Sequence, residues 1–288
     1  MIQMTSITRG KMMHKRRNWN ERIPQGRLKI EPRDIQILKT LLNYRFLTTS
    51  QIQRNFFSSK SFADRRLRNL YDHGILERII RPVTQGKAEL LYAIGSEGAR
   101  QLSLHLGIPR DKLGWSRKGN MVRPEFIQHQ LDLNTLRLAI EEVTKKSPGY
   151  MLLEWESNLK IIVKRGRNLI PDAYFALATP KGNAFFFLEL DRATETVTGK
   201  FRKKMENYQI IRERGEFKRQ FGRENFRVLI VTTSETRLKS LLGIFKNMRL
   251  QILFWLTTFD PILSETFLGN IWLRADKIEL SAVSLCEE

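Results

Sequence analysis

Apolar residues recur at helical spacing in three successive segments, 32–46, 48–56 and 61–73, and this run restricts the fold of the N-terminal third most strongly. Pro32 suits the first position of a helix, where a backbone N–H would have no partner within the helix. Thr48 or Thr49 can cap the second segment. The sequence therefore predicts three consecutive helices.

Two runs with strand character follow the third helix, at 75–81 and 89–94, and a turn-rich basic connection at 82–87 joins them. A further helix is predicted at 96–106. Three helices followed by a hairpin are the order of a winged helix-turn-helix, which we expect over residues 31–106.

The third helix has the two faces that a DNA-recognition helix needs. Apolar residues including Leu67 and Leu70 fall on one stripe that would pack on the first two helices, and the opposite side is basic and polar. Basic and polar side chains on that side can pair with base edges in the major groove. The residues expected to contact DNA are Arg65, Arg66, Arg68 and Asn69 on this helix, and Arg81 and Lys87 around the hairpin turn. An ordinary amphipathic helix with a solvated basic face is the alternative.

Basic residues outnumber acidic ones, with 50 Lys+Arg against 30 Asp+Glu and a formal net charge of +20. The excess is uneven, because residues 1–125 hold 25 basic and 10 acidic side chains (+15), whereas residues 126–288 hold 25 and 20 (+5). A surplus of this kind favours a polyanionic partner, since each phosphate contact releases condensed counterions. We therefore expect double-stranded DNA as the partner, attracted mainly by the N-terminal part.

The remaining segments complete the predicted domain order. Residues 1–30 carry eight basic side chains and one acidic one and predict a flexible basic arm. Glycines and prolines in 107–124 predict a linker. Residues 125–288 interleave strand-like and helical runs, which indicates a domain with a central mixed sheet. The predicted fold class is α+β.

Composition also restricts the class of protein and the cell compartment in which it works. The chain has a single cysteine, Cys286, and four scattered histidines, so neither a disulfide framework nor a Cys/His zinc site is predicted. The most apolar late stretch, 241–256, is interrupted by Lys246 and Arg249 and is not expected to span a membrane. No signal peptide is predicted. We expect a cytoplasmic protein.

Three carboxylates in the second domain are expected to converge at one edge of its sheet. Glu189 and Asp191 are two residues apart in a strand and so share a face, and Asp172 would start the preceding strand beside them. Such an oxygen-rich site suits Mg²⁺ or Mn²⁺, which can polarise a phosphodiester and activate a water. The structural alternative is that Asp172 caps a turn, while Glu189 and Asp191 form ion pairs with Arg192 and Lys204.

These motifs resemble those of the PD-(D/E)xK nuclease superfamily. Pro171-Asp172 stands for the PD, and Glu189-Leu190-Asp191 stands where Glu-x-Lys is expected, so Asp191 replaces the lysine. The resemblance implies a restriction-endonuclease-like domain over 125–288, in which Asp172, Glu189 and Asp191 bind the metal. It also implies that the next helix can supply the catalytic lysine, for which Lys204 is better placed than Lys200.

Over roughly residues 30–275 the chain resembles the replication-relaxation family of plasmids and other mobile elements. The resemblance rests on residues 63–70 and 91–99, the helix that opens near His129, the central runs 171–175, 187–195 and 204–208, and the tail 267–272. It implies a protein that works at a replication or transfer origin.

Three functions are compatible with these features. The first is a DNA-binding accessory protein of plasmid or mobile-element replication or transfer. The second is a metal-dependent endonuclease or nickase that uses Asp172, Glu189, Asp191 and Lys204, with Mg²⁺ or Mn²⁺ as its cofactor. The third is a scaffold that brings a relaxase or replication initiator to DNA. Because winged helices often dimerise on palindromic sites, a homodimer is a further expectation.

Overall fold

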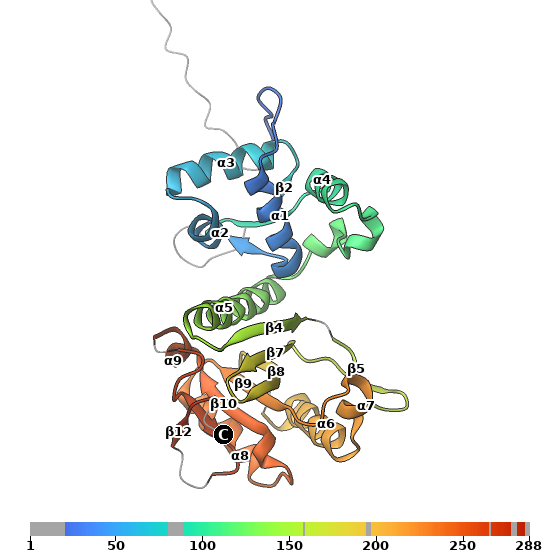
Figure 1. Cartoon of the computed structure of the whole chain (residues 1–288), viewed down its shortest axis with the longest axis vertical. Coiled ribbons are helices and arrows are strands. Elements are labelled where there is room, and N and C mark those ends of the chain that lie inside the picture. The colour runs from blue at the N-terminus through green and yellow to red at the C-terminus, as the bar shows by residue number, and fades with distance from the viewer. Residues whose placement is uncertain are drawn as a thin grey trace, which may run out of the picture. The chain divides into compact units, whose positions relative to one another are not determined.

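Contacts within the chain divide it into unit 1 (residues 1–127) and unit 2 (residues 128–288), which appear in Figure 1. The computed structural model describes residues 21–79, 89–157, 159–193, 197–264, 266–277 and 281–285. Unit 1 is mainly helical, and unit 2 is built on a mixed sheet. The predicted α+β class is therefore confirmed.

Unit 1 contains three helices, then a hairpin and a fourth helix. Its elements are α1 (Pro32–Tyr44), β1 (Leu47–Thr48), α2 (Thr49–Phe56), α3 (Lys60–Asp72), β2 (Leu76–Ile79), β3 (Leu91–Ile94) and α4 (Ser96–Leu106). The strands form an antiparallel sheet in the order β1-β3-β2. This is the element order of a winged helix-turn-helix. Arg81 and Lys87, in the connection between β2 and β3, lie outside the described residues.

Side-chain caps determine where the helices of unit 1 begin. Thr48 and Gln51 form a capping box at the start of α2, in which each side chain bonds the backbone N–H of the other. Ser59 accepts a hydrogen bond from the N–H of Phe62 at the start of α3. At α4, a Cβ on Gly98 would lie 2.1 Å from the Ile75 carbonyl oxygen, so only glycine permits this close approach.

Residues 107–124, expected as a linker, instead pack on unit 1. Trp115 and Asn120 both donate side-chain hydrogen bonds to the Ile94 carbonyl, at 3.1 and 2.9 Å. Leu113 is buried. The segment forms two short 3₁₀ turns, η1 (Arg110–Leu113) and η2 (Arg117–Asn120). The glycines and prolines that predicted a linker therefore belong to a folded segment.

Unit 2 is built on a seven-stranded sheet in the order β12-β11-β10-β9-β8-β7-β4. Strands β8, β9 and β10 run parallel to one another, and the other neighbours are antiparallel. The elements are α5 (Pro124–Lys146), β4 (Met151–Glu156), β5 (Ile161–Lys164), β6 (Arg167–Leu169), β7 (Ala173–Thr179), β8 (Gly182–Asp191), η3 (Val197–Phe201), α6 (Arg202–Glu213), α7 (Glu216–Phe221), β9 (Arg227–Thr232), α8 (Glu235–Phe245), η4 (Gln251–Leu253), β10 (Phe254–Thr258), α9 (Phe259–Ser264), β11 (Trp272–Arg274) and β12 (Ala282–Val283).

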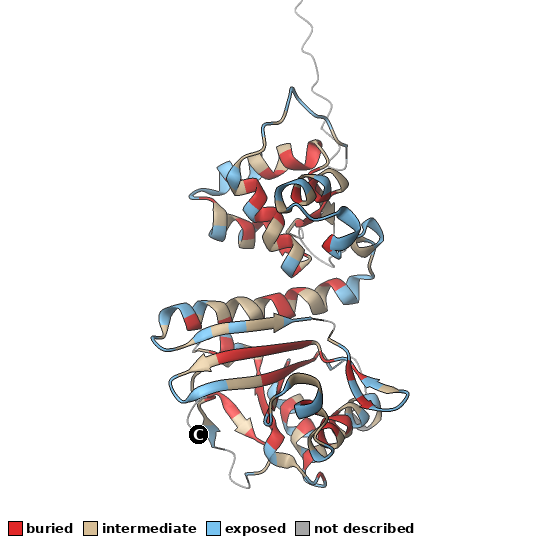
Figure 2. Ribbon diagram, turned by 45° about the vertical axis from the view of Figure 1, so that its right-hand side comes forward, coloured by how far each residue is buried: buried red, intermediate tan, exposed pale blue. Residues whose placement is uncertain are grey.

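Each face of this sheet is covered by its own apolar layer. Helices α6, α7 and α8 cover one face, where Phe187 and Tyr208 are fully buried. Helix α5 and the segment 259–272 cover the other face, where Phe175 and Trp255 are buried. Figure 2 shows buried residues along the middle strands, whereas β4 at the edge carries several exposed ones.

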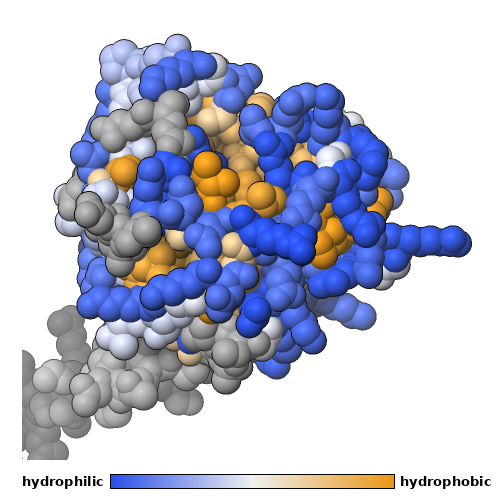
Figure 3. All heavy atoms as spheres, turned by 90° about the horizontal axis from the view of Figure 1, so that it is seen from below, coloured by the Kyte–Doolittle hydropathy of each residue, from blue (hydrophilic) through white to orange (hydrophobic). Residues whose placement is uncertain are grey.

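Hydrophilic residues dominate the surface in the view from below, with hydrophobic residues gathered toward the middle of that face (Figure 3). In the part of the chain that the structure describes, every helix is too short or too polar to cross a membrane.

Candidate functional site

Helix α3 is anchored by a buried apolar back, as its sequence pattern predicts. Ala63, Leu67 and Leu70 are all 0% exposed and pack into the core of unit 1. Arg65 is exposed on the opposite side, and its guanidinium carbon lies 5.3 Å from the ring centre of Phe62. Phe62 is itself 49% exposed, so this end of α3 presents a cation and an aromatic ring together.

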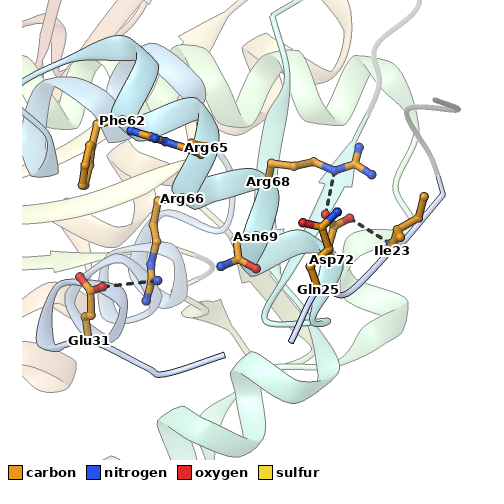
Figure 4. Close-up of a pocket in the computed structure, with 9 residues that line it drawn as sticks. All are labelled: Ile23, Gln25, Glu31, Phe62, Arg65, Arg66, Arg68, Asn69 and Asp72. Atoms are coloured by element: carbon orange, nitrogen blue, oxygen red, sulfur yellow. Dashed lines mark hydrogen bonds and ion pairs between the residues drawn. The ribbon is translucent and has the colours of Figure 1, made fainter. Parts of the chain in front are cut away.

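The other two arginines of α3 are held by ion pairs within unit 1 (Figure 4). Arg66 bonds both carboxylate oxygens of Asp34, which is 0% exposed, and lies 3.4 Å from Glu31. Arg68 pairs with Asp72 at 3.0 Å, one turn along the same helix. Two of the predicted DNA contacts therefore also hold unit 1 together.

Residues 21–31, which we call the N-terminal strap, lie along α3, although the sequence predicted a flexible arm through residue 30. The Glu21 carbonyl accepts a hydrogen bond from Arg68 at 2.7 Å, and the Lys29 carbonyl accepts one from Arg66 at 2.8 Å. The N–H of Ile23 donates to Asp72 at 3.3 Å. The first twenty residues of the predicted arm lie outside the described residues.

A cavity of about 530 Å³ lies between the strap and α3, and Figure 4 shows the side chains that line it. Its lining combines Arg65 and Asn69 with the apolar groups of Phe62 and Ile23. Glu31 and Asp72 also line it and pair with Arg66 and Arg68, so the recess beside α3 is mixed in charge and partly apolar, and Arg65 is an exposed cation in its lining.

In unit 2, the register of β7 and β8 brings two of the predicted carboxylates together. Ala173 is paired with Leu188, so Asp172, one residue before β7, falls opposite Glu189. The Leu190 N–H donates to Asp172 Oδ2 at 2.7 Å, which fixes that carboxylate against β8. Glu189 lies within β8 and is 3% exposed.

Helix α6 supplies the cation and the phenol of this cluster. Lys204 donates a hydrogen bond to Glu189 Oε2, and its Nζ lies 3.7 Å from Asp172 Oδ1. Tyr208, one turn later, donates to Glu189 Oε1 and is fully buried. Lys204 thus contacts both acids, while Lys200 is exposed at the preceding turn.

His129 joins the same cluster, and sequence reasoning gave it no role there. Its Nε2 lies 3.3 Å from Asp172 Oδ2. It comes from α5, so its spacing along the chain carries no sign of the contact. Only the position of α5 on the sheet brings His129 to the end of β7.

Asp191 does not join the other two carboxylates. Arg237, from α8, donates to both of its oxygens at 2.8 Å, and Thr232 donates to Oδ2 at 2.8 Å. Glu189 and Asp191 share a face of β8, as their two-residue spacing predicts, but different helices bind them. Arg192, suggested as an alternative partner, pairs with Asp132 at 3.0 Å.

Burial and neighbouring charges shift the pKa values in the cluster. Burial raises the pKa of Glu189 to about 7, against the opposing charge of Lys204. Burial also disfavours the charged form of Asp172, but the His129 hydrogen bond, the Lys204 charge and the Leu190 N–H together keep its pKa below the usual value. The hydrogen bond to Asp172 raises the pKa of His129. At neutral pH, Asp172 is therefore ionised and Glu189 is near its midpoint.

The number of carboxylates that come together determines which kind of divalent cation site the cluster could form. In the described part of the chain, no three His, Cys, Asp or Glu side chains come together as a metal-binding group. Mg²⁺ is often bound by one or two carboxylates together with water and phosphate oxygens. Asp172 and Glu189 fit an ion of that kind, shared with a phosphodiester, whereas the expected three-carboxylate site is not assembled because Asp191 is bound by Arg237.

Comparison with solved structures finds the restriction endonuclease FokI, at 14% sequence identity and a TM-score of 0.28. The similarity covers 78% of this chain and 42% of the FokI chain. A similarity this weak does not establish a common fold. No curated protein sequence matches the chain.

A family profile matches much more of the sequence. The profile of the replication-relaxation family matches residues 38–225, well over half of the chain. The match includes α3 of unit 1 and, in unit 2, Asp172, Glu189 and Lys204. The chain belongs to the replication-relaxation family.

Proposed function

We propose that this chain is a DNA-binding accessory protein of plasmid or mobile-element replication or transfer, and that it binds duplex DNA through unit 1. The observation that carries the proposal is α3, which sets exposed Arg65 and Phe62 in front of a fully buried apolar back. Arg65 can pair with guanine from such a position. We infer that the protein works in the cytoplasm, where a relaxase or replication initiator would be its protein partner.

The charge distribution supports the same unit as the DNA-binding part. Unit 1 holds 25 basic and 10 acidic side chains (+15), whereas unit 2 holds 25 and 20 (+5). Because phosphate contacts supply most of the sequence-independent attraction, the more basic unit should approach the duplex first. Base contacts from α3 would then add specificity.

Fluorescence anisotropy with labelled duplexes from the element's own origin tests this function on the full chain. Arg65→Ala should weaken binding by about 1–3 kcal/mol and relax the sequence preference, because a base contact is lost. Arg165→Ala, a matched change at an exposed arginine of unit 2, should leave binding unchanged. Equal losses from both substitutions would show that only total charge matters and that α3 reads no bases.

A metal-dependent DNA nuclease is a second candidate, favoured by the contact of Lys204 with both Asp172 and Glu189. With Mg²⁺ or Mn²⁺ bound, the ion would polarise the phosphodiester and activate a water. The ammonium of Lys204 would stabilise the charge that develops on the phosphate.

Supercoiled plasmid incubated with and without Mg²⁺ or Mn²⁺ tests this second candidate. If the site cuts DNA, Asp172→Ala and Lys204→Ala should both abolish metal-dependent nicking while DNA binding is retained. Lys203→Ala, at the exposed neighbouring lysine, is the matched control. Plasmid that stays supercoiled with wild-type protein at every metal concentration excludes the activity, and nicking that survives both substitutions places it elsewhere.

A further inference from the structure

The sheet of unit 2 ends at β4, and none of the described strands pairs with the outer edge of β4. At the opposite end the sheet finishes with β12, which is only two residues long. β4 has six residues and exposes two large apolar side chains, Met151 (57%) and Leu153 (40%). Proteins often protect a free edge with a very short strand, a proline, charged side chains or a β-bulge. The sequence of β4, Met-Leu-Leu-Glu-Trp-Glu, has no lysine or proline, and its protection is limited to two glutamates and one bulge.

A groove of about 470 Å³ lies beside this edge. It is lined by Arg137, Glu141, Thr144 and Lys145 of α5 and by residues 150–155, which include most of β4. An incoming strand that pairs with the edge of β4 would therefore also find a recess for its side chains. An exposed sheet edge with pockets for side chains beside it is where an extended strand can be added to a sheet.

The charges at the two ends of β4 indicate which strand fits. The last turn of α5 carries Lys145 and Lys146, and a tight turn, closed by the Tyr150 N–H on the Ser147 carbonyl at 3.1 Å, leads from it into β4. The other end of β4 is Glu156, which is exposed. One end is therefore basic and the other acidic.

A second copy of β4 in antiparallel orientation matches this pattern. Around a two-fold axis, Glu156 of each copy would lie near Lys145 of the other, and the apolar middles of the two strands would meet. In a parallel pairing, the exposed Glu156 side chains of the two copies would lie side by side and repel, whereas Glu154 is already paired with Arg223. The pattern thus favours antiparallel pairing with itself.

We propose that β4 is a dimerisation edge, at which two copies of this chain pair antiparallel near Leu153 and join their sheets. A β-bulge between Leu152 and Glu154 interrupts the ladder with β7, so the regular pairing is short. The apolar contacts of Met151 and Leu153 must then supply much of the association free energy. The proposal does not depend on DNA binding.

Sedimentation equilibrium of the full chain without DNA tests the proposal. The wild-type chain should dimerise at micromolar concentration. Leu153→Lys should raise the dimer dissociation constant roughly tenfold or more, because it places a charge in the apolar middle of the interface. Ile162→Lys, at a 51% exposed isoleucine of β5, is the matched control and should leave the constant unchanged. A monomeric wild-type chain, or a dimer insensitive to Leu153→Lys, overturns the proposal.

Charge reversal tests the orientation of the two strands. Glu156→Lys and Lys145→Glu should each weaken the dimer, and the two together in one chain should restore it, because the opposed charges are exchanged. All of these positions lie at the surface, so thermal unfolding followed by circular dichroism should confirm an intact fold. If the double variant dimerises as weakly as the single variants, the two-fold pairing is ruled out. The edge of β4 would then be a site for an extended segment of another protein.

Discussion

At the scale of single residues, Lys204 of the cluster in unit 2 contacts two carboxylates, Asp172 and Glu189, whose surroundings differ. Glu189 is buried, whereas Asp172 is fixed by a backbone N–H and contacts His129. Their pKa values consequently move apart, as happens where two carboxyls lie in unlike surroundings. The stability of the folded chain should therefore depend on pH, whether or not the cluster cuts DNA.

We predict that stability falls as pH rises from about 5 to about 8. The pKa of Glu189 is raised to about 7 in the folded chain, so its contribution is complete below the ordinary glutamate pKa and is lost as pH rises through 7. The raised pKa of His129 acts in the same direction, whereas the lowered pKa of Asp172 acts only at more acidic pH. Urea unfolding of wild type and Glu189→Gln across this range measures the effect. A pH profile that is equally steep in the variant would contradict it.

At the scale of secondary structure, α3 carries two arginines that hold unit 1 together and one exposed arginine that we propose contacts DNA, and the sequence pattern could not tell them apart. Helical periodicity indicated which arginines avoid the core, but it could not show which of them meet an acid from another element. Arg66 meets Asp34, 32 residues away, and Arg68 meets the strap as well as Asp72. Among the three arginines of α3, Arg65 is the exposed one, and it lies beside the ring of Phe62.

We predict that Arg65→Ala and Arg66→Ala produce opposite patterns. Arg66→Ala should destabilise unit 1 by about 3 kcal/mol, because it leaves the buried Asp34 carboxylate without its cation. Arg65→Ala should cost DNA affinity and almost no stability, since its side chain is exposed. Chemical denaturation and anisotropy on the same two variants separate the effects. If Arg66→Ala lost DNA affinity without losing stability, Arg66 would be a DNA contact and not a structural residue.

Much of the secondary structure could be predicted from the sequence because its periodicity is local. The third helix is predicted at 61–73 and occupies Lys60–Asp72, and the strand predicted at 89–94 is β3, Leu91–Ile94. The short strands β11 and β12 and the packed segment 107–124 were missed, because nothing in their own sequence carries a period. In the cluster, the facing of Asp172 and Glu189 follows from strand spacing. The contacts of His129 and Arg237 depend on where α5 and α8 pack, which periodicity does not encode.

At the scale of the whole molecule, the two units differ in charge by ten, +15 against +5, so they should contribute unequally to any complex with DNA. Several described acids of unit 2 are paired with its own cations, as at Arg237–Asp191 and Arg223–Glu154. Unit 1 has the larger surplus that DNA phosphates can neutralise.

We predict a steep salt dependence of DNA binding by the full chain. The logarithm of the association constant should fall linearly with the logarithm of salt concentration, and Lys87→Ala should reduce that slope by about 1 through the loss of one phosphate contact. Its effect should be the same for specific and unrelated duplexes. Anisotropy titrations at several salt concentrations measure the slope. A Lys87→Ala effect confined to one DNA sequence would make Lys87 a base contact instead.

The ion pair between Arg66 and the buried Asp34 has a consequence for how this protein could diverge within its family. A residue that joins two helices cannot change freely, since each substitution would be selected against through loss of folding. Residues with no such task, above all Arg65 and Phe62, can vary at little structural cost. If unit 1 reads DNA through α3 as proposed, new target sequences should arise by substitution at the first turns of α3, while Arg66 is retained among relatives.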